Sequence, residues 1–282
     1  MMYTVAHELG AEAHARARRS RATTNLVLRQ TLLHLHARAC QVVAEIICLM
    51  ENGFADGAMA RWRTLHEIVV VGAVIAKHGD DIARRYRAHE AIEAKRAMDR
   101  FRISHSALGF GPPSQREIDA VEREYHNALE LYGHRFGSEY GWAAHHLGIT
   151  KPRFIDLEQA AGKPEMRSYY VMASYNVHAS PRGLAFRLGL LRGQGEPIAI
   201  VGASNIGFVE PAQNAAADLV HITSLIVDPK VRLDRAIELK ILILLRDQIA
   251  AKLDRAHRGV VSAHSALKRS RATAKAKRKR QD

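Results

Sequence analysis

One segment of the chain concentrates side chains that can hold anions and transfer protons. Residues 60–67 read ARWRTLHE and stand directly before the longest apolar run, Ile68 to Ala76. Arg63 and Glu67 are four residues apart, so on a helix they share a face and can form an ion pair. Burying such a pair is costly unless its hydrogen bonds are satisfied. The segment is therefore either an ion pair that fixes packing or the lining of a cleft.

Arg61 and His66 form a second pattern within this segment. An arginine can hold a phosphate, and a histidine can transfer a proton near neutral pH. With 31 Arg and 16 His in 282 residues, roughly two pairs at this spacing are expected by chance, and the chain holds four. The pattern is similar to the R-x4-H motif of HEPN-type ribonucleases, an all-helical family. The resemblance implies that Arg61 and His66 from paired protomers flank a scissile phosphate as catalytic residues.

A second polar segment, residues 169–182, reads YYVMASYNVHASPR. Ser174 and His178 are four residues apart and could hydrogen-bond as a nucleophile with its base. The sequence offers neither a strand-to-helix elbow for the serine nor an acid placed to orient the histidine. The segment is therefore expected to be the polar end of a core helix or, alternatively, a ligand-lining patch that includes Tyr175 and Asn176.

Three sets of residues resemble the landmarks of an uncharacterised bacterial helical family, a domain of unknown function. They are the segment from Arg61 to Glu67, the run Arg84-Arg85-Tyr86, and residues 175–181, YNVHASP. The resemblance spans roughly residues 30–250. It implies that a set of pocket candidates gathers in one place, and it carries no activity. The candidates are Arg63, Glu67, Tyr86, Ser174, Tyr175, Asn176 and His178.

Several common catalytic patterns are missing from the sequence. There is no P-loop motif, and the G-x-G triplets lack a third glycine. The three His-Glu pairs lack the second histidine of a zinc protease, and no Glu-x-x-His occurs for a di-iron site. We therefore expect no metal and no cofactor. Cys40 and Cys48 lie eight residues apart on one predicted helix, too far for a disulfide, which favours a reducing cytoplasm.

The formal net charge of +13 is concentrated at the two ends of the chain. One basic cluster runs from Arg16 to Arg21, and a larger one fills the last fifteen residues. Basic clusters of this kind favour non-specific contact with nucleic-acid phosphates. The longest apolar run has nine residues, whereas a membrane span needs about 20, so we expect a soluble cytoplasmic protein. The cations of the C-terminal cluster are Lys268, Arg269, Arg271, Lys275, Lys277, Arg278, Lys279 and Arg280.

The elements that position these residues are predicted to be helices, because apolar residues recur at spacings of three, four and seven. The fold class is all-α, a bundle of six to seven main helices with one small β-hairpin near residues 198–209. The domain plan is a flexible N-terminus over 1–17, a single helical domain over 18–259 and a disordered basic tail over 260–282. The predicted main helices span residues 18–50, 55–77, 80–105, 114–135, 164–178, 211–227 and 231–258, and a short helix is predicted near 153–161.

These features predict a soluble helical protein of unknown specific activity that binds a partner and contacts nucleic acid through its basic ends. The alternative from another class is a metal-independent HEPN-type endoribonuclease that acts as a toxin or anti-phage effector. The third hypothesis is a structural homo-oligomer, a homodimer in the simplest case, without catalysis. Fold class alone does not choose among them, so whether the chain is an enzyme stays open.

Overall fold

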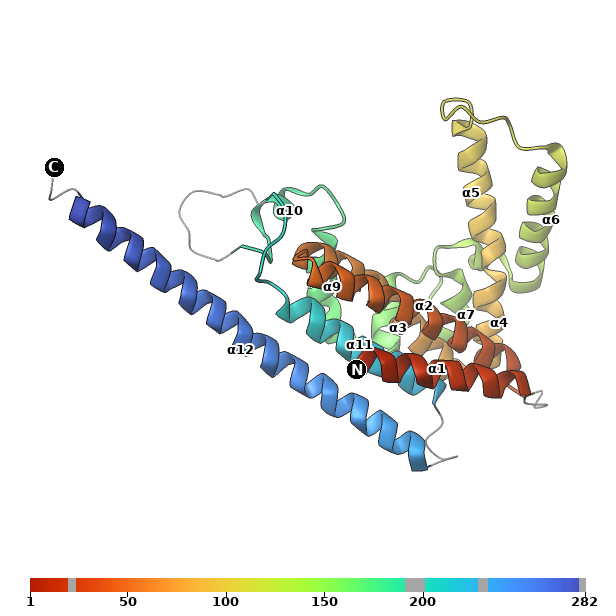
Figure 1. Ribbon diagram of the computed structural model, residues 1–282. Helices are drawn as coiled ribbons and strands as arrows, with labels where there is room; N and C mark the ends of the chain where they lie inside the picture. The colour runs from red at the N-terminus through yellow and green to blue at the C-terminus, as the bar shows by residue number, and fades with distance from the viewer. Residues whose placement is uncertain (20–23, 191–200, 228–232, 279–282) are drawn as a thin grey trace. The chain divides into compact units, whose positions relative to one another are not determined.

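The computed structural model describes residues 1–19, 24–190, 201–227 and 233–278, and Figure 1 traces their elements. These residues are all-helical and contain no strand, which confirms the all-α class. They divide into two compact units, where the sequence suggested a single domain over 18–259. Unit 1 comprises residues 1–16, 35–69 and 168–282, and unit 2 comprises residues 17–34 and 70–167. The boundaries fall inside four helices, so the sequence has no break that marks a change of unit.

Unit 1 is built on a core of aliphatic side chains and one tryptophan. Ile46, Trp62, Leu65, Leu219 and Ile222 are among its most buried residues. The two C-terminal helices, α11 and α12, pack against each other. The helices that contribute to unit 1 are α1 (Met2–Arg19), α2 (Leu26–Glu51), α3 (Ala55–His78), α9 (Arg167–Ser174), α10 (Pro181–Ala185), α11 (Val209–Ile226) and α12 (Leu233–Arg278).

Unit 2 takes the first part of α2 and the end of α3 and adds shorter helices. The helix predicted over 80–105 is two helices that meet at His89, whose ring nitrogen bonds the Ser138 carbonyl at 2.9 Å. Breaks of this kind explain why the helices outnumber the six or seven expected. The predicted capping box at Ser114 and Glu117 is confirmed. The added elements are α4 (Asp80–Ala88), α5 (Glu90–Ser104), α6 (Gln115–Tyr132), η1 (His134–Gly137), α7 (Gly141–Leu147), α8 (Phe154–Ala160) and η2 (Pro164–Met166).

The predicted hairpin near 198–209 is wrong for the part of it that the structure describes. Residues 201–208 form no strand, and residues 198–200 lie outside the described residues. The Ser204 amide donates instead to the Gly53 carbonyl at 2.9 Å, and its hydroxyl donates to the Gly189 carbonyl at 2.9 Å. Ile206 is buried. The segment therefore satisfies its backbone against the turn after α2, because no neighbouring strand is there to pair with it.

The N-terminus is a helix where the sequence suggested a flexible segment over 1–17. Ala6, Leu9 and Gly10 of α1 are buried. A Cβ built on Gly10 would lie 2.5 Å from Cε1 of His36, so glycine lets α1 approach the imidazole ring of α2. This close packing gives the first turns of the chain a fixed place in unit 1.

The basic C-terminal segment is also helical as far as Arg278, where the sequence suggested a disordered tail from residue 260. Gly259 lies inside α12 and does not end it. Glycine costs about 1 kcal/mol in a helix interior, whereas the Ala, Lys and Arg that follow are among the best helix formers. Local propensity therefore carries the helix through a segment that has too few apolar residues to build a core.

Among the described residues, α2 alone is long and apolar enough to cross a membrane. About half of its most apolar stretch is buried inside the chain. Core helices of soluble proteins have the same properties, so this helix gives no firm sign of a membrane protein.

We predict that Gly10→Ala destabilises the protein by about 1–3 kcal/mol, because the added methyl group must displace the His36 ring. Gly259→Ala is the matched control, since it makes the same change in a helix where the new Cβ meets nothing within 4 Å. Urea unfolding measures both. Equal stability of the two variants would show that α1 does not pack on His36 in solution.

His36 should make the folded state sensitive to acid. Burial, with a smaller contribution from His7, lowers the pKa of His36 to about 4 from its usual 6.5. As the pH falls below 6.5, His36 becomes protonated in the unfolded chain but stays neutral in the folded chain. The unfolded state is therefore favoured increasingly, and the folded state loses stability down to about pH 4. Between these limits we expect wild type to lose about 3 kcal/mol relative to His36→Gln, measured by urea unfolding at each pH. If the unfolding free energies of wild type and His36→Gln changed with pH by the same amount, the lowered pKa of His36 would be contradicted.

Candidate functional site

The segment from Arg61 to Glu67 lies on α3 and contacts three other helices of unit 1. Arg61 pairs with Glu45 of α2 and donates to the Thr64 hydroxyl at 3.3 Å. Trp62 and His66 contact α11, and Arg63 and Glu67 contact α9. The helical period explains this, because residues four apart share a face and residues one apart point in different directions.

A buried carboxylate on α11 receives the two ring donors of α3. Oδ2 of Asp218 accepts a hydrogen bond from Nε1 of Trp62 at 2.9 Å and another from Nδ1 of His66 at 3.3 Å. All three residues are fully buried. The two rings lie 5.1 Å apart, so they also pack on each other. Because an ionised carboxylate only accepts hydrogen bonds, Nδ1 is the protonated nitrogen of His66 in this contact.

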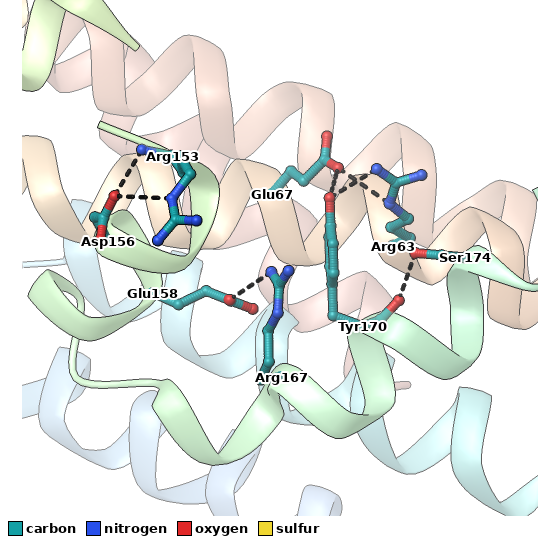
Figure 2. A network of polar contacts seen from close by, with 8 residues as sticks. All are labelled: Arg63, Glu67, Arg153, Asp156, Glu158, Arg167, Tyr170 and Ser174. Carbon is teal, nitrogen blue, oxygen red and sulfur yellow. Dashed lines mark hydrogen bonds and ion pairs between the residues drawn. The ribbon is translucent and has the colours of Figure 1, made fainter. Parts of the chain in front are cut away.

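The predicted ion pair between Arg63 and Glu67 is confirmed, with Nε of Arg63 at 3.3 Å from Oε1 of Glu67. Tyr170 of α9 joins it from the side, as Figure 2 shows. The Tyr170 hydroxyl accepts a hydrogen bond from Arg63 at 2.7 Å and donates one to Glu67 at 2.6 Å. The guanidinium also stacks 4.7 Å from the centre of the Tyr170 ring. A phenol and an ion pair therefore form one closed network between α3 and α9.

Burial is the main cause that raises the pKa of Tyr170 to about 12, and the hydrogen bond to Glu67 adds to it. The phenol therefore keeps its proton at neutral pH and remains the donor in this network. The side chains of Arg63 and Glu67 are 24% and 38% exposed, so the ion pair is only partly desolvated. The outer edge of the pair reaches water.

Ser174 and His178 do not form a nucleophile–base pair. The Ser174 hydroxyl donates to the backbone carbonyl of Tyr170 at 2.8 Å, a bond within α9 (Figure 2). The His178 side chain is exposed, beyond the end of α9, because the helix stops at Ser174. Tyr175 and Asn176 are half-buried, and both amide atoms of Asn176 lack a hydrogen-bond partner among the described residues.

The remaining pocket candidate, Tyr86, belongs to unit 2. Its ring packs edge-on against Trp142 at 5.1 Å, and burial together with Glu93 raises the pKa of its hydroxyl. Unit 2 also holds an ion pair that the sequence did not single out. Arg167 donates to the fully buried carboxylate of Glu158 at 3.0 Å. Figure 2 draws this pair and the Arg153–Asp156 contact at the start of α8.

The placement of Arg61 and His66 gives no support to phosphate cleavage. Arg61 is held by Glu45, and His66 is fully buried against Asp218. A histidine that reaches no solvent has no path to a scissile phosphate. No three His, Cys, Asp or Glu side chains come together as metal ligands among the residues that the structure describes.

Two partners of α3 were not singled out in the sequence, Tyr170 of α9 and the α11 residue Asp218. Asp218 is the one acidic residue between Pro211 and Val227, in a stretch that is otherwise mostly apolar. A single carboxylate in such a setting must find donors, so its burial was signalled even though its partners were not.

We predict that Asp218→Ala costs about 3–5 kcal/mol of unfolding free energy, because it removes the carboxylate that accepts from two buried ring donors. Arg63→Met should cost about 1 kcal/mol, since its ion pair is partly exposed. Asp247→Ala, which removes an exposed carboxylate of α12, is the control. Chemical unfolding of the three variants checks this order. If Arg63→Met cost more than Asp218→Ala, the buried carboxylate would not be the main tie between the helices.

Comparison with known proteins agrees with the resemblance to an uncharacterised helical family. A family of unknown function, DUF5677, matches residues 30–196, more than half of the chain. The match contains the segment from Arg61 to Glu67 and its partner Tyr170, and it ends before Asp218 and α12. No curated protein and no solved structure matches the chain. The chain therefore belongs to DUF5677, a family of unknown function.

Proposed function

We propose that this chain is a soluble cytoplasmic protein that binds nucleic acid, without sequence preference, through the C-terminal half of α12. The observation that carries the proposal is the charge of that half. From Arg255 to Gln281 the sequence holds ten Lys and Arg and neither Asp nor Glu. A polycationic helix of this kind attracts a polyanion by releasing the counterions that surround its phosphates.

Exposure of the described cations supports the proposal. Arg258 pairs with Asp254, and the next acid in the sequence after Asp254 is Asp282. The cations between them therefore stand in a stretch without acidic neighbours in the sequence. Lys279 and Arg280 lie outside the described residues, whereas Lys275, Lys277 and Arg278 continue the helix. The cations described as exposed are Arg255, Arg258, Lys268, Arg269 and Arg271.

The length of α12 also supports the proposal. The helix has 46 residues and α11 has 18, so at 1.5 Å per residue their lengths are about 69 and 27 Å. More than half of α12 therefore extends past the end of α11 and is available to a partner (Figure 1). A preformed helix also loses less backbone entropy on binding than a disordered tail would.

The spacing of the cations favours contact with phosphates rather than with base edges. At about 100° per residue, the exposed cations from Arg255 to Arg271 point to several sides of the helix. Cations that surround a helix can meet phosphates on any sequence, and phosphate contacts carry no sequence information directly. Non-specific binding with a strong dependence on salt is the expected behaviour.

We predict that deletion of residues 262–282 weakens binding to mixed-sequence duplex DNA and RNA while the melting temperature stays nearly unchanged. If all eight cations of the C-terminal cluster meet duplex phosphates, the log–log salt slope of the full chain approaches about −7, and deletion should flatten it. Fluorescence anisotropy over a range of about 50 to 200 mM salt measures both quantities.

A second variant separates charge from length. Replacing the eight cations by Gln keeps good helix formers and should weaken binding as much as the deletion does. Replacing Arg38, Lys77, Lys151 and Lys163, which lie outside α12, is the control and should leave affinity nearly unchanged. Equal affinity of wild type and the Gln variant at low salt would overturn the proposal.

A further inference from the structure

Unit 1 contains an apolar cavity of about 290 Å³ that none of the interactions above uses. It lies among the start of α1, the second half of α2, α11 and α12. Its walls are aliphatic side chains with one aromatic ring, that of Tyr3. The cavity is partly open to solvent, and an open apolar groove of this size on a protein surface calls for a reason.

The cavity exists because α11 presents small side chains to it. Ala212, Ala215 and Ala216 share one face of α11 by their spacing, and all three line the cavity. Longer residues face them from the other helices, including Met50 of α2 and Leu253 of α12. A leucine at any of the three alanine positions would fill much of the space.

One cation stands among these apolar residues. Of the described residues that line the cavity, Lys252 alone is charged, and its side chain is exposed at the edge. Its ammonium group donates to the Gln248 side chain at 3.1 Å and has no carboxylate partner among the described residues. An apolar chamber with one unneutralised ammonium group at its edge is complementary to an apolar chain that ends in an anion.

We propose that this cavity binds a medium-chain fatty acid, with the acyl chain inside and the carboxylate paired with Lys252. The volume is at the lower end of the range of about 300–1,000 Å³ for small-molecule pockets, which suits a short or medium chain better than a long one. Burial of the methylene groups supplies the affinity, and the charge pair supplies the preference for an acid. The inference is independent of nucleic-acid binding, because none of the lining residues belongs to the C-terminal cluster.

The experiment compares dodecanoate with dodecanol on the delipidated full-length chain, below the concentration at which either aggregates. The readout is displacement of a dansyl-labelled undecanoic acid, supported by thermal shift. Dodecanoate should bind at least about tenfold more tightly than dodecanol, because only the acid pairs with the ammonium group. Butyrate, which has the carboxylate without the chain, should not displace the probe.

Two pairs of variants test the two parts of the site. Ala216→Leu should abolish binding of both ligands, whereas Ala217→Leu, the same change on a residue that does not line the cavity, should not. Lys252→Gln should remove the preference for the acid and leave dodecanol binding unchanged. Lys240→Gln, an exposed lysine on the same helix, is the control and should retain the preference.

Three results would overturn the proposal. One is that neither ligand binds to wild type. Another is that Ala216→Leu, shown to be folded by its circular dichroism, binds dodecanoate as wild type does. The third is that the cavity is closed by a second copy of the chain, which would appear as a dimer in sedimentation that excludes the probe. Loss of nucleic-acid binding on deletion of residues 262–282 should leave all of these measurements unchanged.

Discussion

The carboxylate of Asp218 is the polar group around which unit 1 is arranged. It is fully buried, and one of its oxygens accepts hydrogen bonds from both Trp62 and His66. A buried charge without donors would be expensive, so α11 must present this residue to α3. The orientation of α11 that points Asp218 toward α3 also points a different face of α11 toward the cavity. That face carries Ala212, Ala215 and Ala216. One hydrogen-bonded carboxylate thus fixes both the core contact and the chamber beside it.

The unusual residue types of α3 are explained by the contacts between helices. Arg61 is held by α2, the rings of Trp62 and His66 by α11, and Arg63 with Glu67 by the Tyr170 phenol of α9. Residues that seemed suited to catalysis instead form polar contacts between helices. Apolar packing alone would not fix how these helices are positioned along one another. Hydrogen bonds are directional, whereas the hydrophobic effect is not, so such ties select one arrangement of the helices.

Local patterns in the sequence predicted local structure well. The C-terminal end of α2, the bounds of α3, the capping box at Ser114 and the Arg63–Glu67 pair all follow from spacings of a few residues. The partners of those residues could not be predicted in the same way, because Tyr170 and Asp218 lie more than a hundred residues from the segment that they contact. The hairpin was wrong over the described residues 201–208, because β-branched residues form a strand only where a neighbouring strand pairs with them. The segment predicted to be a disordered tail is helical as far as Arg278, because its Ala, Lys and Arg residues favour a helix even where apolar residues are few.

Gly259 divides α12 into two parts with different surroundings. Before it, Ile249 and Leu253 face the cavity, and after it the described side chains of Lys268, Arg269 and Arg271 are exposed. A glycine in a helix interior is the position at which the helix bends at the lowest energetic cost, and here nothing lies within 4 Å of the place of a Cβ. Under the proposed function, bending at Gly259 would turn the cationic half of α12 along a curved surface, while the half packed on α11 keeps its place.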